Sequence, residues 1–217
     1  MNALQGHNSI ARATPGETMM GIMIKKMFWL ICFVALAMTM VSCGEGERPL
    51  PKPKGYFRID LPEKNYVTID TLQRYAFEVP SYAQITHDPF SPQEKNWINV
   101  EMPDFKASIH LTHKEVNGNL GDYLEDVHTM VTKHLQKANG MNDSLIVNPE
   151  HHVYGMLIEM EGKGVATPLQ FYLTDSTANF VRGALYFNFV PNNDSMQPVI
   201  ESIRKDIDRM IETFEWK

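Results

Sequence analysis

The stretch Leu120-Gly-Asp-Tyr-Leu-Glu-Asp-Val-His-Thr-Met-Val-Thr-Lys-His-Leu-Gln-Lys-Ala138 decides the fold, because its apolar residues recur every three or four positions. That spacing places them on one face of a helix. The residues on this face are Leu120, Tyr123, Leu124, Val127, Val131, Leu135 and Ala138. Asn119 can cap the start of the helix, and Gly140 can end it. The stretch therefore predicts an amphipathic helix that needs a second element to cover its apolar face.

Around this helix the period falls to two, which is typical of half-buried strands. Four strand-like segments come before the helix and three come after it: 75–79, 82–86, 97–102 and 106–112, then 153–160, 169–174 and 179–190. Gly162-Lys-Gly164 and Asp175-Ser-Thr177 are short connections, and short connections favour antiparallel neighbours.

A second amphipathic helix is predicted over residues 194–217, with Asp194 and Gln197 as a capping pair. Its stripe consists of Val199, Ile200, Ile203, Ile207, Met210, Ile211 and Phe214. The order of elements predicts an α+β domain, with a mostly antiparallel sheet of about seven strands covered by two long helices. With Phe77-Glu-Val-Pro80 near its start and Thr213-Phe-Glu-Trp216 at its end, the pattern resembles the Mog1/PsbP α/β/α sandwich.

The N-terminal part of the chain carries an export pattern that ends at a cysteine. Lys25 and Lys26 precede an apolar run of about 15 residues, which is too short to span a bilayer, since a spanning helix needs ~20. The run closes with Met40-Val-Ser-Cys43, which resembles a bacterial lipobox apart from Met40, where Leu is usual. We expect cleavage before Cys43 and acylation of Cys43 with fatty chains such as palmitate. The alternatives are an ordinary secretory signal and a short core helix.

Three regions follow from this pattern. Residues 1–42 are expected to be removed, as a start extension plus a lipoprotein signal peptide. Residues 1–22 are polar and unpatterned, which suggests a true start at Met23 or Met27. Residues 43–55 are an acylated Cys followed by a tether with Pro49, Pro51 and Pro53, which favour extended polyproline II. Residues 56–217 are expected to form one α+β domain, in which 56–73 are an N-terminal arm packed on it.

Composition excludes several classes of function. The chain has 20 basic and 26 acidic residues. Loss of Arg12, Lys25, Lys26 and Glu17 with residues 1–42 would leave a net charge of about −8, so nucleic acid is not an expected partner. The two cysteines of the chain both lie at or before the acylation position. The folded domain is therefore expected to lack disulfides, thiol catalysis and thiolate metal sites.

The histidines give weak evidence for a metal site. His110 and His113 are three apart on a strand and should face opposite sides of it, and His128 and His134 lie about 240° apart around a helix. His151 and His152 are adjacent at a strand start. Only a combination across elements, such as His110 and His151 with a carboxylate, could bind a metal. We predict no metal and no cofactor.

The remaining candidates for catalysis also have plainer explanations. Ser176 lies in a short connection without a Gly-x-Ser-x-Gly motif, and Arg182 is better explained by cross-strand pairing. The acidic cluster Asp122, Glu125 and Asp126 complements the dipole at a helix start. Gly162-Lys-Gly164 is too short to cradle a phosphate and no helix follows it directly. The sequence predicts no catalytic residues and no enzyme.

Several linked segments of the chain belong together as one pattern. They are Pro51-Lys-Pro-Lys-Gly-Tyr-Phe-Arg-Ile-Asp-Leu-Pro62, Phe105-Lys-Ala-Ser-Ile-His-Leu111, Val153-Tyr-Gly155, Gln170-Phe-Tyr-Leu-Thr-Asp-Ser-Thr177, Arg182-Gly-Ala-Leu-Tyr-Phe187 and Asn193-Asp-Ser195. This pattern resembles one family, the gliding motility lipoprotein GldD of Bacteroidetes. The resemblance covers residues 43–217. It implies an envelope lipoprotein needed for gliding and for the associated type IX secretion machinery, with Cys43 as the one residue of defined chemistry.

The resemblance leads to a function without catalysis. We expect a lipid-anchored protein that acts through assembly or partner binding, held to the membrane by acyl chains on Cys43. Only Glu45 and Glu47, separated by Gly46, follow the anchor where a surface-export signal would be a strongly acidic run. This favours the periplasmic face of the outer membrane. The alternative is a periplasmic binding or metal-assisted hydrolytic module that acts on cell-wall or glycan material.

Overall fold

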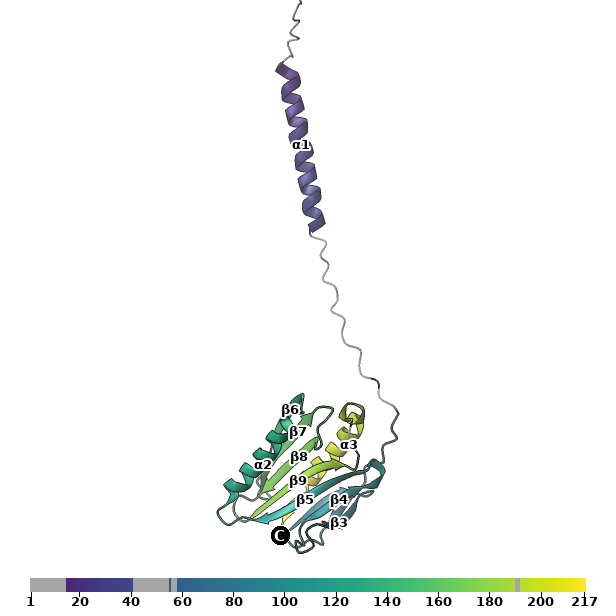
Figure 1. Cartoon of the computed structure of the whole chain (residues 1–217), viewed down its shortest axis with the longest axis vertical. Helices are drawn as coiled ribbons and strands as arrows, with labels where there is room; N and C mark the ends of the chain where they lie inside the picture. Colours follow the sequence, from purple (N-terminus) through teal and green to yellow (C-terminus); the bar gives the residue numbers. More distant parts are fainter. Residues whose placement is uncertain (1–14, 41–54, 56–57, 190–191) are drawn as a thin grey trace, which may run out of the picture. The chain divides into compact units, whose positions relative to one another are not determined.

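The computed structural model describes residues 15–40, 55, 58–189 and 192–217. The chain divides into two compact units, Met1–Lys54 and Gly55–Lys217. In the first unit, helix α1 spans Pro15–Met40 and is 26 residues long (Figure 1). It begins before Met23, so residues 15–22, which show no pattern in the sequence, are part of the helix. None of the described helices combines the length and the apolar character needed to cross a membrane.

The second unit is an α+β domain built on an antiparallel sheet. Its elements are β1 (Tyr66–Ile69), β2 (Tyr75–Pro80), β3 (Gln84–His87), β4 (Ile98–Met102), the 3-10 helix η1 (Pro103–Phe105), β5 (Ala107–Glu115), α2 (Leu120–Leu135), β6 (Gly140–Asn148), β7 (Val153–Glu161), β8 (Leu169–Thr174), β9 (Asn179–Phe187), α3 (Asn193–Glu212) and β10 (Glu215–Trp216). Seven strands form one sheet in the order β3-β4-β5-β9-β8-β7-β6, and β1-β2-β10 form a small second sheet. The predicted α+β class with a seven-stranded antiparallel sheet is confirmed.

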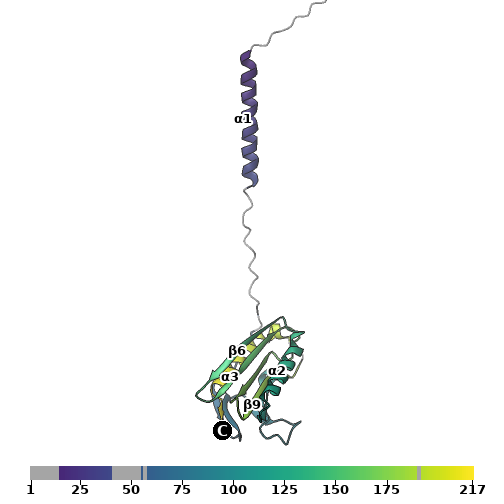
Figure 2. The ribbon, with the colours of Figure 1, turned by 90° about the vertical axis from the view of Figure 1, so that its left-hand side faces the viewer.

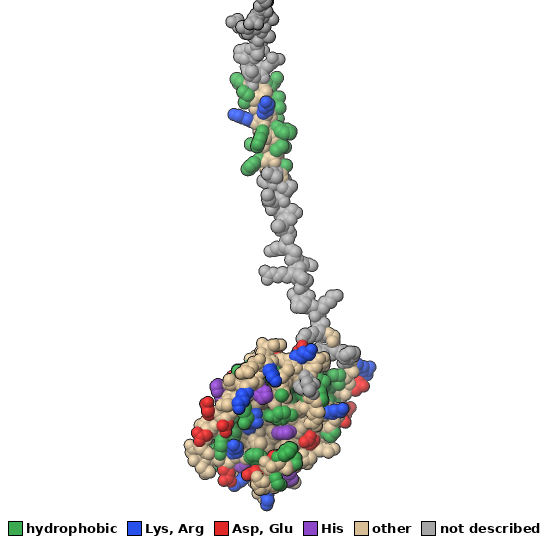
Figure 3. Space-filling model, viewed as in Figure 1, with side chains coloured by type: hydrophobic (Ala, Val, Ile, Leu, Met, Phe, Trp, Pro, Cys, Tyr) green, Lys and Arg blue, Asp and Glu red, His purple; other side chains and the backbone are tan. Residues whose placement is uncertain are grey.

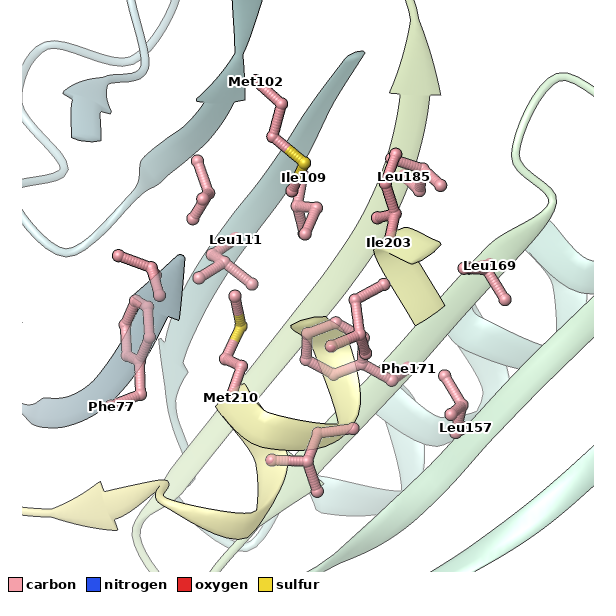
Figure 4. Packing of buried hydrophobic residues seen from close by; sticks show 14 of the residues in the cluster. Phe77, Met102, Ile109, Leu111, Leu157, Leu169, Phe171, Leu185, Ile203 and Met210 are labelled. Atoms are coloured by element: carbon pink, nitrogen blue, oxygen red, sulfur yellow. The ribbon is translucent and has the colours of Figure 1, made fainter. Parts of the chain in front are cut away.

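The two long helices cover opposite faces of the large sheet (Figure 2). In β7, β8 and β9, alternate residues point to α3 or to α2, as the period of two requires. On the α3 face, Ile203 and Met210 pack among buried strand residues such as Ile109, Phe171 and Leu185 (Figure 4). On the α2 face, a smaller cluster joins Val127 and Val131 to strand residues including Ile158, Met160 and Phe180. Apolar burial on both faces is the main stabilising term for this domain.

The close approach between β8 and β9 needs a glycine. Gly183 on β9 lies directly opposite Phe171 on β8. A Cβ placed at Gly183 would lie 2.2 Å from the Phe171 ring, so the ring occupies the space that any other residue would fill. The glycine in the Arg182-Gly183 dipeptide therefore allows the Phe171 ring of β8 to enter the core.

The large sheet has seven strands, as predicted, but three of the ten described strands (β1, β6 and β10) were not predicted, and the membership of the sheet was partly wrong. Strand β6 was not predicted, because Gly140 was expected only to end a helix. The predicted strand at residues 75–79 is β2, which lies in the small sheet with β1, a part of the expected N-terminal arm. Strand β9 ends at Phe187 rather than at residue 190.

The predicted helices differ from the observed ones at their ends. Helix α3 ends at Glu212 instead of Lys217, because Thr213 donates its hydroxyl to the Arg209 carbonyl and the chain then pairs with β2 as β10. Its N-cap position is Asn192 rather than Asp194, and Asn192 makes no side-chain capping bond. Asn119 does precede α2, but its side chain binds the Asn117 backbone N–H instead of a helix N–H.

Candidate functional site

Two of the predicted candidates, His151 and His152, line an open hollow of about 690 Å³. Two strand connections and β10 form it, since the β6–β7 turn supplies Glu150, His151 and His152, and the β8–β9 turn supplies Asp175 and Thr177. The third wall is formed by Glu215 and Trp216. These connections meet because β6, β7, β8 and β9 are sequential antiparallel neighbours.

The carboxylate of Asp175 is already used by its own turn. Its Oδ1 accepts backbone N–H bonds from Thr177, Ala178 and Asn179 at 2.8–2.9 Å, and its Oδ2 accepts the Asn179 side chain at 2.7 Å. Burial alone would raise the pKa of Asp175, but these four donors stabilise the anion and lower the pKa to about 2. Asp175 is therefore a turn-forming residue whose acceptor positions are occupied.

A second polar contact in the hollow joins His151 to Glu215. His151 Nδ1 lies 3.4 Å from Glu215 Oε1, and their side chains are 38% and 59% exposed. Trp216 donates its indole N–H to the His152 carbonyl at 3.1 Å, which fixes β10 to the β6–β7 turn. This arrangement can hold the end of the chain in place, and an exposed pair of this kind contributes little free energy.

The structure does not bring His110 and His151 together. His110 is an exposed residue on β5, where its ring lies 4.9 Å from that of Tyr186. His151 precedes β7, three strands away in the sheet, which corresponds to ~14 Å at ordinary strand spacing. Within the described ranges no three His, Cys, Asp or Glu side chains are placed to share a metal ion. The His110–His151 combination is therefore not assembled.

His113 behaves as the strand pattern predicts. It faces the side of β5 opposite to His110 and is buried, with its Nε2 3.0 Å from the Asn179 side-chain oxygen. Burial lowers the pKa of His113. The pKa of His134 on α2 is also lowered, by burial first and then by Arg182 and Lys137. Both rings are therefore held towards their neutral forms.

The other candidates from the sequence lie in turns, strands and a helix surface, where local contacts account for them. Ser176 lies in the β8–β9 turn with a φ of 68°, and its N–H binds Thr174 Oγ1. Arg182 donates from Nη2 to Gln170 on the neighbouring strand at 2.6 Å, so it is paired across strands as expected. The acidic residues Asp122, Glu125 and Asp126 are exposed on α2. In the Gly162–Gly164 connection, the Gly162 and Val165 carbonyls both accept from Asn193.

The most concentrated polar cluster was not predicted. Asp206 on α3 is completely buried and accepts three hydrogen bonds: from Lys64 Nζ at 2.6 Å, from the Tyr66 hydroxyl at 3.0 Å, and from the Tyr82 hydroxyl. Lys64 also donates to the Ser202 carbonyl at 3.1 Å. Burial and the bond to Asp206 raise the pKa of Tyr66 to about 12 and raise that of Tyr82 further. The cluster joins the N-terminal arm to α3 through satisfied polar groups.

One sequence signal could have found Asp206. It lies between Ile203 and Ile207 on the apolar stripe of α3, where a carboxylate is out of place unless a cation covers it. Its partner Lys64 is 142 residues away in the chain, and no local pattern indicates that pairing.

The surface of the domain carries interspersed charges. On the face that Figure 3 shows, basic and acidic side chains alternate with apolar ones. The anchor candidate Cys43 lies outside the described residues, as do most of the tether and the end of the export segment. Cys32 belongs to α1 and is exposed.

These features define an α+β domain whose buried polar cluster serves to fix its own N-terminal arm, preceded by a separate hydrophobic helix. The model of one family, described as gliding motility lipoprotein GldD, matches residues 46–216. The chain belongs to this family, as the sequence resemblance indicated. It is therefore a lipoprotein associated with gliding motility and with the cell envelope.

The other comparisons add less. No curated protein matches the chain. Among solved structures, the chain is similar to the cyanobacterial PsbP protein (CyanoP) of Synechocystis, with a TM-score of 0.43 and 10% identity. That similarity covers 74% of this chain and 98% of the other. It carries no inference about function.

Proposed function

We propose that this chain is anchored by acyl chains on Cys43 and supports gliding and the associated type IX secretion machinery through assembly or partner binding, without catalysis. The observation that carries this proposal is the family match, which begins at residue 46, directly after the lipobox-like Met40–Cys43. Two carboxylates, Asp175 and Asp206, have their oxygens occupied by donors from the fold itself. This agrees with a structural role for both groups and with a function that does not use them in catalysis.

The location we propose is the periplasmic face of the outer membrane. The support is the short acidic content after the anchor, where Glu45 and Glu47 are separated by Gly46. Protease treatment of intact cells should leave the protein uncut, while permeabilised cells should lose it. Digestion in intact cells would instead place it on the outer surface.

The anchor is tested by a matched pair of cysteine substitutions. Cys43→Ser should abolish labelling with radioactive palmitate and release the protein from the envelope fraction, whereas Cys32→Ser should do neither. Gliding and secretion of type IX substrates should fail in the first strain only. If the Cys43→Ser protein kept both the palmitate label and its membrane association, acylation of Cys43 would be refuted, even if gliding failed in that strain.

The absence of catalysis is tested separately. Ser176→Ala, His151→Gln and Glu215→Gln change exposed or turn positions, so the proteins should fold and support normal spreading and secretion. Loss of both functions in a variant that still folds and reaches the envelope would favour an enzyme. The cell-wall or metal-assisted alternative has less support, because the combination of His110 and His151 that motivated it is not assembled.

A further inference from the structure

Strand β6 presents the longest open strand edge in the described part of the chain. It is the last strand of the seven-stranded sheet and is nine residues long, and its one strand partner is β7. The strand at the other end, β3, has four residues, and the edge strands β1 and β10 of the small sheet have four and two. An edge strand carries a row of backbone N–H and C=O groups that can pair with another strand.

The side chains of β6 do not protect this edge. Met141, Leu145 and Val147 point to the α2 face and are 43%, 75% and 59% exposed. The strand contains no Pro or Lys, the residues that usually block such pairing, and Asp143 is its single charge. Ile146 points to the opposite face and packs partly on the main core. The edge is therefore open, nearly uncharged and apolar on one side.

We propose that β6 pairs with β6 of a second copy of this chain, antiparallel about a two-fold axis, so that two seven-stranded sheets become one continuous sheet. A two-fold axis makes the same strand its own partner, so the sequence of β6 must complement itself. Opposite residues in an antiparallel pair lie on the same face and interact directly.

Charge selects the register. With the axis at Ile146, Leu145 of each copy lies opposite Val147 of the other, and the two Asp143 side chains are ~20 Å apart along the strands. With the axis at Ser144, each Asp143 would lie opposite Leu145 and only ~7–8 Å from the other Asp143, within the screening length of physiological salt. The first register joins Leu145 and Val147, the two most exposed apolar residues of β6, and keeps the two Asp143 side chains apart.

The segment of this same chain nearest to the domain is a poor substitute for a second copy. Residues 41–54 include Pro49, Pro51 and Pro53, which have no N–H to donate to a strand ladder. A strand pair of this size is smaller than a standard interface of ~1,600 Å², so it is weak between freely diffusing molecules. Anchoring both copies to one membrane raises their effective concentration, which makes a small interface sufficient.

Disulfide trapping of the full-length protein in envelope membranes tests the pairing. Ile146→Cys places a thiol on the proposed axis, where opposite Cα atoms ~4.5–5.5 Å apart permit a disulfide. Ile85→Cys on β3 is the matched control, because Ile85 is also a half-buried isoleucine on an edge strand of the same sheet and packs on the same core. After mild oxidation, the Ile146→Cys dimer should exceed the Ile85→Cys dimer by on the order of tenfold. The unaltered chain reports any background from Cys32 and Cys43.

Charged substitutions on the Ile146→Cys background test the register. L145D/V147D places like charges opposite each other and should reduce the trapped dimer on the order of tenfold, whereas L145K/V147D places opposite charges there and should restore it. Both positions are exposed, so thermal unfolding should change little in either variant.

Three results would overturn the proposal: no excess of Ile146→Cys dimer over the Ile85→Cys level, equal dimer in the two charged variants, or a disulfide from position 146 to a different protein. The last result would identify the edge as a docking strand for another partner. None of these results bears on the acylation of Cys43, so the pairing and the proposed function can fail independently.

Discussion

Replacing Asp206 by Asn tests whether the buried cluster holds the N-terminal arm on the domain. The substitution keeps the shape of the side chain and removes its charge. Lys64 then keeps its positive charge beside α3 without a counter-ion, and the new amide N–H₂ must face a donor, because Lys64, Tyr66 and Tyr82 all donate to Asp206.

The size of the effect follows from burial. Removing one partner of a fully buried ion pair costs about 3–5 kcal/mol. The carboxylate of Asp206 is completely buried, but the Lys64 side chain is 28% exposed and water can solvate part of its charge. We therefore expect a loss of about 2–3 kcal/mol in the free energy of unfolding, or roughly 5–10 °C in Tm for a domain of this size.

Urea unfolding of residues 55–217, a compact unit with its own core, measures this loss. Asp208→Asn is the control, since Asp208 lies on the same helix and forms an ion pair with Arg204 while 45% exposed. Its cost should be about 0.5 kcal/mol or less. The double variant K64M/D206N should be more stable than the sum of the single losses predicts, because both charges are removed together.

Equal stability of the D206N and D208N proteins would refute this reasoning. Additive losses in the double variant would refute it as well, because they would mean that Lys64 and Asp206 do not interact energetically.

Three further predictions concern pH and packing. The pKa of Asp175 falls from 3.8 to about 2 on folding, so its charge stabilises the domain above pH ~4. At neutral pH the native protein should exceed D175N in unfolding free energy by about 1 kcal/mol, since the group is partly exposed. Urea titrations should show this difference vanishing between pH ~4 and ~2. Burial lowers the pKa of His113, so the free energy of unfolding should fall as pH drops below ~6.5. His113→Gln should reduce this pH dependence, and His134→Gln should reduce it less. An unchanged pH dependence in both variants would contradict the lowered pKa values. G183A should cost about 2–4 kcal/mol because of the Phe171 ring, and F171L in the same chain should recover part of it; a simple sum of the two losses in the double variant would argue against the contact.

The sequence predicts those elements that bury one regular face. All seven residues in the predicted stripe of α3 are buried, including Phe214 just beyond its end. Strand β6 escaped prediction because most of its residues are exposed and Asn142-Asp-Ser144 have low strand propensity, so no clear alternation marks it. The end of α3 was misplaced because Phe214 continues the helical spacing although it follows the helix.

The polar sites are harder to predict, for a physical reason. The turn at Asp175 was readable from Asp175-Ser-Thr177, since the carboxylate binds N–H groups two to four residues away. The contact of Lys64 with Asp206 depends on how the N-terminal arm and α3 pack. The one indication in the sequence was Asp206 itself, a carboxylate in the apolar stripe of α3. The His110–His151 combination failed because β9 and β8 separate β5 from β7 in the sheet, an order that the sequence does not reveal.

The position of the Asp206 cluster has a mechanical consequence. Tension that enters the domain from its N-terminal side reaches Lys64 before it can act on the β1–β2 pairing, which begins at Tyr66. A short strand such as β1 would peel away bond by bond, whereas the buried carboxylate makes the arm and α3 resist together. In a lipoprotein of a motility system, this cluster rather than the sheet would set the force at which the domain begins to open.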